Sequence, residues 1–170
     1  MKITKLTIKN HQNGYAVLEL LFYMSLFSVL SLVVISAMIT MAKSFKETAI
    51  QAELVQSGTI MERISREIRA SYDINSISAS NLVLNTTDDS GANKTIEFSL
   101  LDSDIRLLEN GIFTGNLNTS KITTTDLSFV SIVTAEGKAV KIFFTVRSEN
   151  DASGRAQDFY NTVVLRGGYQ

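Results

Sequence analysis

Hydrophobic and polar residues follow three successive patterns along this chain, and the first pattern is purely apolar. From Leu20 to Ala42, 23 consecutive residues carry no charge, and serines and one threonine are their only polar members. As a helix this stretch would be ~34 Å long, against a bilayer hydrocarbon core of ~30 Å. Because helices of soluble domains are rarely apolar on every face, we predict a membrane-spanning helix over residues 15–42.

The second pattern, over residues 43–70, has the period of an amphipathic helix. Its apolar residues recur three, four or seven positions apart, which places them on one face. Glu62 with Arg66 and Arg63 with Glu67 are expected to form ion pairs one turn apart on the remaining surface. No proline interrupts the chain, so one helix over residues 15–70 is predicted, with Gly58 as its weak point. The predicted apolar face consists of Ile50, Leu54, Met61, Ile64 and Ile68.

The third pattern, over residues 71–170, consists of short runs rich in Val, Ile, Thr and Phe, separated by clusters of Gly, Asn and Asp. Such runs, with no helical pattern between them, predict an antiparallel sheet with one buried face. The sheet would cover the apolar face of the helix, giving an α+β lollipop with a β-rich head. The expected strands are residues 81–86, 94–101, 104–109, 126–134, 138–147 and 158–166.

Charge divides the chain in a way that its net charge of −1 conceals. Residues 1–14 contain Lys2, Lys5 and Lys9 and no acidic residue. The positive-inside rule therefore predicts a cytoplasmic N-terminus and an exported segment after Ala42. Without the leader, 13 basic residues stand against 17 acidic ones. This mildly acidic remainder has no basic stripe of the kind that binds nucleic acid.

The composition argues against an enzyme. The 170 residues include no cysteine and a single histidine, His11, which lies in the leader. Disulfides, thiolate zinc sites and a cysteine nucleophile are excluded. No Gly-rich phosphate loop follows a predicted strand, and no pair of carboxylates is distinguished from ordinary surface acids. We therefore predict a protein that builds or binds, without a cofactor.

An ordinary secretory signal would also place an apolar segment near the N-terminus. Such a signal has an apolar region of roughly 7–15 residues followed by small residues at the cleavage site. Residues 40–42, Thr-Met-Ala, could provide that site. The apolar run is longer than this, however, and Glu19 lies at its entrance, so we favour a retained helix.

The run from Asn13 to Leu21, with the leader before it and the apolar helix after it, resembles the type IV pilin and pseudopilin superfamily. The shared features are a basic leader, Gly14, the aromatic Tyr15 and Glu19 at the fifth position from Tyr15. Two features depart from the family pattern: Tyr15 replaces the commoner phenylalanine, and the helix lacks the family's frequent prolines. The resemblance is specific over about the first 30 residues.

The resemblance implies a processing and assembly pathway. A prepilin peptidase would cut between Gly14 and Tyr15 on the cytoplasmic face and N-methylate the new amine of Tyr15. The mature protein would first be held in the lipid of the cytoplasmic membrane, with its β-rich head outside. An inner-membrane assembly platform would then add it to a filament of other pilin subunits. Pseudopilins of type II secretion systems share this pathway. A single-span membrane protein that binds a ligand through its head and never polymerises is the alternative from another functional class.

Glu19 is a functional candidate independently of the resemblance. An unpaired acid in a membrane helix costs several kcal/mol, so a cation nearby is expected. In the family, that cation is the terminal ammonium of a neighbouring subunit. The competing interpretation is a carboxylate that reaches the cytoplasmic headgroup layer.

Two further segments resemble a subgroup more loosely. Residues 61–71 and 161–170 are similar to minor pilins of the W type and pseudopilins of the J type, which act as priming or tip subunits. This favours a minor subunit over a major, shaft-building pilin. The same segments could equally be a solvated helix face and a core strand with a basic end.

Acidic clusters at residues 88–90 and 102–104 are similar to the calcium loops of some pseudopilins. Calcium takes six to eight oxygen ligands, and neither cluster has an EF-hand-like spacing with a closing glutamate. Turn chemistry accounts for Asp, Ser and Gly at these positions. No metal site is therefore predicted.

Overall fold

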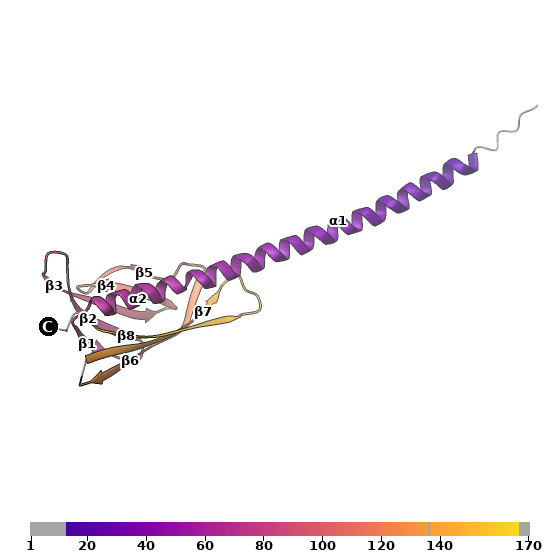
Figure 1. Ribbon diagram of the computed structural model, residues 1–170. Helices are drawn as coiled ribbons and strands as arrows, with labels where there is room; N and C mark the ends of the chain where they lie inside the picture. The colour runs from indigo at the N-terminus through magenta and orange to yellow at the C-terminus, as the bar shows by residue number, and fades with distance from the viewer. Residues whose placement is uncertain (1–12, 136, 167–170) are drawn as a thin grey trace, which may run out of the picture. The chain divides into compact units, whose positions relative to one another are not determined.

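The computed structural model describes residues 13–135 and 137–166, and the chain divides into two compact units, residues 1–47 and 48–170 (Figure 1). Helix α1 (Asn13–Gln56) begins in the first unit and ends in the second, where α2 (Gly58–Ala70) follows it. The helix predicted over residues 15–70 is thus present, with an irregularity at Ser57.

Ser57 interrupts the helix only slightly. Its φ of −61° and ψ of −19° are still those of a right-handed helix. The Ser57 N–H donates to the carbonyls of both Glu53 and Leu54 at 3.2 Å, and the Ile60 N–H donates to the Ser57 carbonyl at 3.1 Å. The hydrogen bonding therefore tightens for one turn at Ser57, directly before the glycine that was expected to be the weak point.

The second unit contains two antiparallel sheets, where the sequence pattern predicted one. All six expected strands are present, and two shorter strands, one on either side of the first three, complete the set. The strands are β1 (Asp73–Ile77), β2 (Asn81–Thr87), β3 (Asn93–Leu101), β4 (Asp104–Glu109), β5 (Ile112–Asn116), β6 (Ile122–Thr134), β7 (Gly137–Ser148) and β8 (Ala156–Val164). The fold class, α+β with antiparallel strands, is confirmed.

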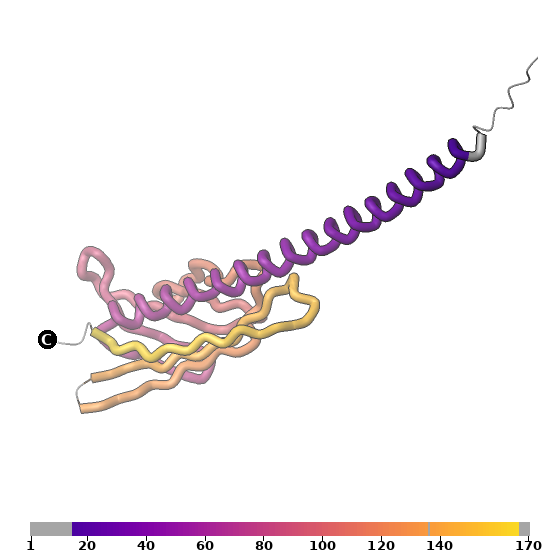
Figure 2. Tube along the Cα trace, turned by 45° about the vertical axis from the view of Figure 1, so that its right-hand side comes forward, coloured from indigo at the N-terminus to yellow at the C-terminus, as the bar shows by residue number. Residues whose placement is uncertain are grey.

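Each sheet is a meander in chain order, because hairpin connections join successive strands (Figure 2). One sheet has the order β1-β2-β3-β4-β5 and the other has the order β6-β7-β8. The sheets meet along β6, where the Phe129 N–H donates to the Ala79 carbonyl and the Thr124 N–H donates to the Ser103 carbonyl, both at 2.9 Å. An ion pair between Lys138 and Asp73 links β7 to β1.

One hydrophobic core joins the helical segment 48–70 to both sheets. The five residues predicted for the apolar helix face are all buried, so that prediction is confirmed. Phe98 from the first sheet and Phe144 from the second are fully buried, and the Phe144 ring stacks on Phe159 with centroids 5.0 Å apart. Burying each such side chain contributes about 1.5–3 kcal/mol.

The two ion pairs expected on α2 have different outcomes. The Arg63 Nε lies 3.0 Å from the Glu67 Oε1, as predicted. The prediction for Glu62 and Arg66 is wrong: both side chains are exposed, and the structure contains no ion pair between them. Such a solvated pair gains only about 0.2–0.5 kcal/mol, too little to hold two long side chains together.

Candidate functional site

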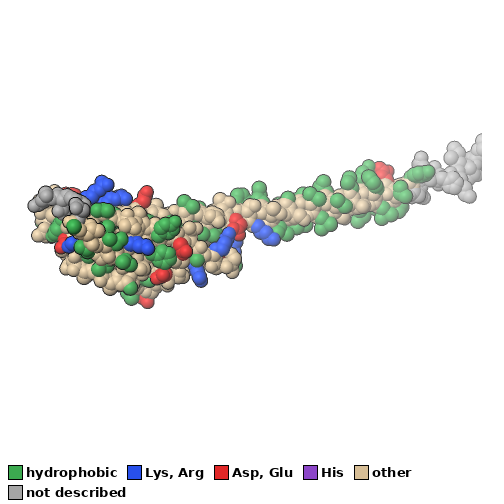
Figure 3. All heavy atoms as spheres, turned by 60° about the horizontal axis from the view of Figure 1, so that its bottom comes forward, with side chains coloured by type: hydrophobic (Ala, Val, Ile, Leu, Met, Phe, Trp, Pro, Cys, Tyr) green, Lys and Arg blue, Asp and Glu red, His purple; other side chains and the backbone are tan. Residues whose placement is uncertain are grey.

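The N-terminal part of α1 carries exposed apolar side chains along its length (Figure 3). Within the first unit, the exposed fractions of its large hydrophobic side chains from Tyr15 to Met41 lie between 47% and 80%. Exposing apolar area to water costs roughly 25 cal/mol per Å², so this surface is stable only in apolar surroundings. Helix α1 is long and apolar enough to span a membrane. By length and composition, the protein is a candidate single-pass membrane protein.

Glu19 is the acidic residue at the start of this surface. Its Oε1 accepts a hydrogen bond of 3.1 Å from the Tyr23 hydroxyl, one helical turn further on. Among the residues that the structure describes, Glu19 forms no ion pair. One neutral donor satisfies only part of a carboxylate, which can accept about four hydrogen bonds. Glu19 therefore keeps the capacity to receive a cation from outside this unit.

Tyr23 belongs to this site, and the hydrophobic pattern of the sequence did not identify it. Its distance of four residues from Glu19 was the available signal, because side chains at that spacing meet on a helix surface.

Gly14 and Tyr15 lie in the first turn of α1, which begins at Asn13. The Tyr15 side chain is 80% exposed. The Gly14–Tyr15 peptide bond lies at the start of the described helix, and Tyr15 is four residues before Glu19. Lys2, Lys5, Lys9 and His11 lie outside the described residues.

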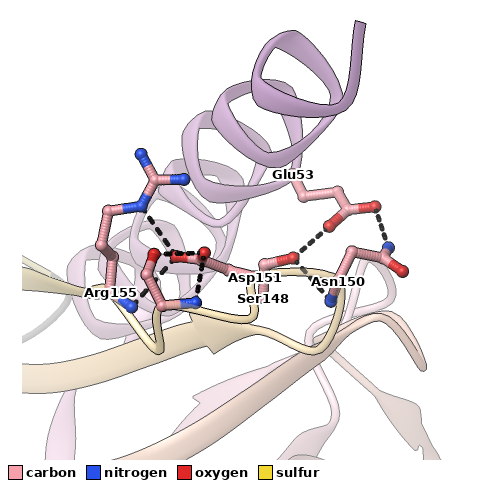
Figure 4. A network of polar contacts seen from close by, with 6 residues as sticks. Glu53, Ser148, Asn150, Asp151 and Arg155 are labelled. Atoms are coloured by element: carbon pink, nitrogen blue, oxygen red, sulfur yellow. Dashed lines mark hydrogen bonds and ion pairs between the residues drawn. The ribbon is translucent and has the colours of Figure 1, made fainter. Parts of the chain in front are cut away.

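A second polar cluster lies within the second unit and involves Glu53 of α1 (Figure 4). The Glu53 carboxylate accepts hydrogen bonds from the Ser148 hydroxyl at 2.5 Å and from the Asn150 Nδ2 at 2.9 Å. The Lys121 Nζ lies 3.9 Å away, and the Glu53 side chain is only 12% exposed. These contacts attach the helix to the end of β7, to the loop that follows β7 and to the residue before β6.

Asp151 organises the same loop. Its carboxylate accepts hydrogen bonds from the Ser153 N–H at 3.0 Å and the Ser153 hydroxyl at 2.5 Å. It also accepts from the Arg155 N–H at 3.0 Å and the Arg155 Nε at 2.8 Å. The Arg155 guanidinium and these donors hold the pKa of Asp151 well below its ordinary value. The carboxylate is therefore fully engaged by its own loop, which makes its role structural.

The acidic clusters considered for calcium form turns. The Asp88 Oδ1 accepts from the N–H groups of Ser90 and Ala92, both at 2.9 Å. Asp102 and Ser103 have φ values of 50° and 71°, in the left-handed region that tight turns use. No group of three or more His, Cys, Asp and Glu side chains that could hold a metal occurs in the described part of the chain.

Residues 61–71 and 161–166, the described parts of the two segments noted in the sequence, lie together in the second unit. The Asn161 Nδ2 donates to the Ser65 Oγ at 3.1 Å. The Arg166 N–H donates to the Arg69 carbonyl at 3.2 Å. Both segments thus contribute core residues and exposed arginines at the same end of α2.

Gly14, Tyr15 and Glu19 lie close together at the start of the described part of an exposed apolar helix, and they form the candidate site. Comparisons with protein-family models, with curated proteins and with solved structures found no match to this chain.

Proposed function

We propose that this protein is a prepilin whose mature form is a minor subunit of a type IV pilus or a related filament. The observation that carries the proposal is the apolar helix whose side chains are exposed on every face, with Gly14, Tyr15 and Glu19 at its start. A helix that only spans a membrane does not require a glycine five residues before an acid, or an acid at the start of its apolar stretch.

The physical basis of assembly is transfer between two apolar environments. The helix is stored in the bilayer and then packs against equivalent helices in the filament core. Because both surroundings are apolar, little hydrophobic free energy is lost on extraction from lipid.

Glu19 supplies specificity to this transfer. Cleavage after Gly14 creates an ammonium group on Tyr15, and a carboxylate in low-dielectric surroundings attracts such a charge more strongly than in water. Pairing Glu19 with the amine of a neighbouring subunit sets the register of the two helices. The Tyr23 hydroxyl orients the carboxylate before the partner arrives.

The proposal places the leader in the cytoplasm and the β-rich unit outside, following the leader lysines. The partners are other pilin subunits, a prepilin peptidase and an inner-membrane assembly platform. The protein acts as a structural component, without enzymatic chemistry.

The mass of the protein extracted from membranes tests processing. Loss of residues 1–14 together with the mass of one methyl group is expected. An intact Met1 would overturn the proposal in favour of a single-span membrane protein that never polymerises.

Charge reversal at Glu19 tests assembly separately. Glu19→Lys is expected to be inserted and cleaved normally but to be absent from sheared filaments, because two cations would meet at the interface. Glu62→Lys, a reversal of an exposed acid on α2, is the matched control and should assemble. Normal incorporation of Glu19→Lys would show that the pairing role is wrong. A type II secretion system, as opposed to a pilus, would be identified by secretin and secretion-ATPase genes nearby.

A further inference from the structure

The outer edge of β8 is an open strand edge in the second unit. β8 is the last strand of its sheet and pairs with β7 alone. The Leu165 N–H donates to the Lys138 carbonyl of the β7 side at 3.0 Å. Backbone hydrogen-bonding groups alternate in direction along an antiparallel strand. In β8, the N–H and C=O groups of odd-numbered residues therefore bond to β7, and those of even-numbered residues point away from β7.

The outward backbone groups are only partly used by the chain itself. The Thr162 N–H donates to the Asn161 Oδ1, and the Gln157 Nε2 donates to the Asp158 carbonyl. The backbone groups of Tyr160 and Val164 form no outward hydrogen bond to any residue that the structure describes. The Tyr160 side chain is 78% exposed and that of Val164 is 46% exposed. A long edge with exposed apolar side chains is a template for pairing with another strand.

Two hollows flank this edge on its helix side. The first is lined by Gln51, Leu54, Val55, Gln157 and Phe159, and it encloses roughly 480 Å³ of empty space, including the part open to solvent. The second is lined by Met61, Glu62, Ser65, Arg66, Arg69 and Asn161. The helix meets β8 between them, where a Cβ on Gly58 would lie 3.7 Å from the Phe159 ring.

The two hollows are neighbours along β8, because Phe159 lines the first and Asn161 lines the second. Phe159 and Asn161 both point to the helix side and are two residues apart, which is about 6.6–6.8 Å. A strand added next to β8 would direct every second side chain to the same side. One of these side chains would enter the hollow at Phe159, and the residue two positions away would enter the hollow at Asn161.

The residues that line each hollow indicate which side chain of the added strand would fit there. The hollow at Phe159 is mainly apolar because Leu54, Val55 and Phe159 line it. The hollow at Asn161 contains two arginines against one glutamate. Arg66 and Arg69 form no ion pair with any described residue, so this hollow favours an acidic side chain.

We propose that the outer edge of β8 binds an extended segment of a partner protein by strand addition, with an apolar residue and an acidic residue two positions apart on its inner face. Backbone hydrogen bonds to Tyr160 and Val164 provide affinity, and the two hollows provide specificity. The proposal rests on the second unit alone and does not depend on filament formation.

Charge complementarity favours a partner over a second copy of this chain. If β8 paired with β8 of a second copy, the side chains directed at the hollows would be the odd-numbered ones, such as Gln157, Phe159 and Asn161. None of these is acidic, so Arg66 and Arg69 would stay without a counter-charge. Asp158, the acidic residue of β8, lies on the opposite face.

Selection from a displayed library of random nonapeptides tests the proposal, with the full chain held in lipid nanodiscs as bait. Enriched peptides are expected to carry an acidic residue two positions from an apolar one. The double variant Arg66→Glu/Arg69→Glu should bind these peptides about tenfold or more weakly and should favour peptides with lysine at the acidic position. The matched control is Lys141→Glu/Arg147→Glu, which reverses two exposed cations on the opposite face of β7, and it should bind like the parent chain.

Two further measurements locate the binding edge. Hydrogen exchange of residues 156–164 should slow when an enriched peptide is added. Tyr160→Pro, which removes an outward N–H at an edge position where proline is tolerated, should abolish binding, whereas Tyr160→Thr should retain it. The proposal is overturned if no peptide is enriched, if the enriched peptides ignore the arginine reversal, or if protection of residues 156–164 depends on protein concentration without peptide, which would indicate self-pairing.

Discussion

Ile35 and Ile64 carry the same side chain in helical segments of the same chain, yet Ile35 is 53% exposed and Ile64 is fully buried. The same difference in exposure holds for most other large hydrophobic side chains of the two helical segments. Residues 20–42 are apolar on every face and none of their large hydrophobic side chains is buried, whereas residues 48–70 bury one stripe against two sheets. Secondary structure is therefore the same in both segments, but its stability has different sources. The second segment is stabilised by its own core, and the first requires an apolar environment outside the chain.

The largest effect is expected from truncating the two isoleucines in parallel. Ile64→Ala should lower the free energy of unfolding of the second unit by about 2–5 kcal/mol, because it leaves a cavity in a closely packed core. Ile35→Ala should change it by less than about 0.5 kcal/mol. Urea unfolding of both variants in detergent micelles, followed by the β signal in circular dichroism, measures the difference. Equal losses would show that the first segment also packs in the isolated chain.

An arginine introduced into each segment should have the opposite order of effects, with the larger effect in the first segment. Val33→Arg should disfavour membrane insertion by about 2.5–3.5 kcal/mol, the cost of arginine at the centre of a spanning helix. Val55→Arg, at a residue that is 74% exposed in the second segment, should leave insertion unchanged. The fraction of protein that stays in membranes after an alkaline wash reports the result. Full retention of Val33→Arg would argue against a spanning role.

Removing Glu53, the half-buried acid of the second segment, should have an intermediate effect. Glu53→Ala leaves the Ser148 hydroxyl and the Asn150 amide without their acceptor, and such a loss costs about 1–3 kcal/mol. The exposed Glu62→Ala is the control and should be nearly neutral. Urea unfolding again provides the measurement, and equal stability of the two variants would show that the Glu53 contacts are energetically unimportant.

A small stabilisation is expected at the junction near Ser57. Gly58→Ala should raise the free energy of unfolding by about 0.4–1 kcal/mol, because alanine restricts the unfolded chain and favours the helix. The new Cβ would lie 3.7 Å from Phe159, which is an ordinary van der Waals distance. A rise in the urea midpoint without a change in slope is the expected signature, and a fall would show that the helix needs glycine at this turn.

The last comparison concerns low pH and the loop that contacts Glu53. Because the pKa of Asp151 is lowered from its ordinary value of 3.8 in the folded protein, its ionised form stabilises the fold above that value. This contribution is lost as the pH falls below about 4. Asp151→Asn should therefore flatten the loss of stability between pH 4 and more acidic conditions, whereas Asp126→Asn, at an exposed position of β6, should leave it unchanged. Unfolding curves at several acidic pH values compare the two variants.

The sequence was informative where a pattern is local. The spacing of Ile50, Leu54, Met61, Ile64 and Ile68 predicted the buried helix face because a helix repeats every 3.6 residues. The two strands that were missed, β1 and β5, form the two edges of the first sheet. Edge strands are short and polar, and β1 lies in a Ser- and Asn-rich stretch while β5 contains Gly115. The division into two sheets was also missed, since alternation shows which face is buried but not which strand is the neighbour.

The candidate sites show the same limit. Glu19 was identified because an acid interrupts an apolar pattern, and this signal needs no knowledge of contacts. The Glu53 cluster could not be found, because Ser148 and Asn150 lie 95 and 97 residues further along the chain. Arg66 was expected to pair within its helix and is instead part of a hollow next to β8.

The irregular turn at Ser57 has a mechanical consequence. A pulling force on α1 would reach the second unit along the helix backbone and pass through the irregular turn at Ser57. Leu54 before the turn and Ile60 after it are both buried in the same core, however. Both residues would therefore carry part of the tension. The turn at Ser57 could then stretch while the helix stays packed against the sheets.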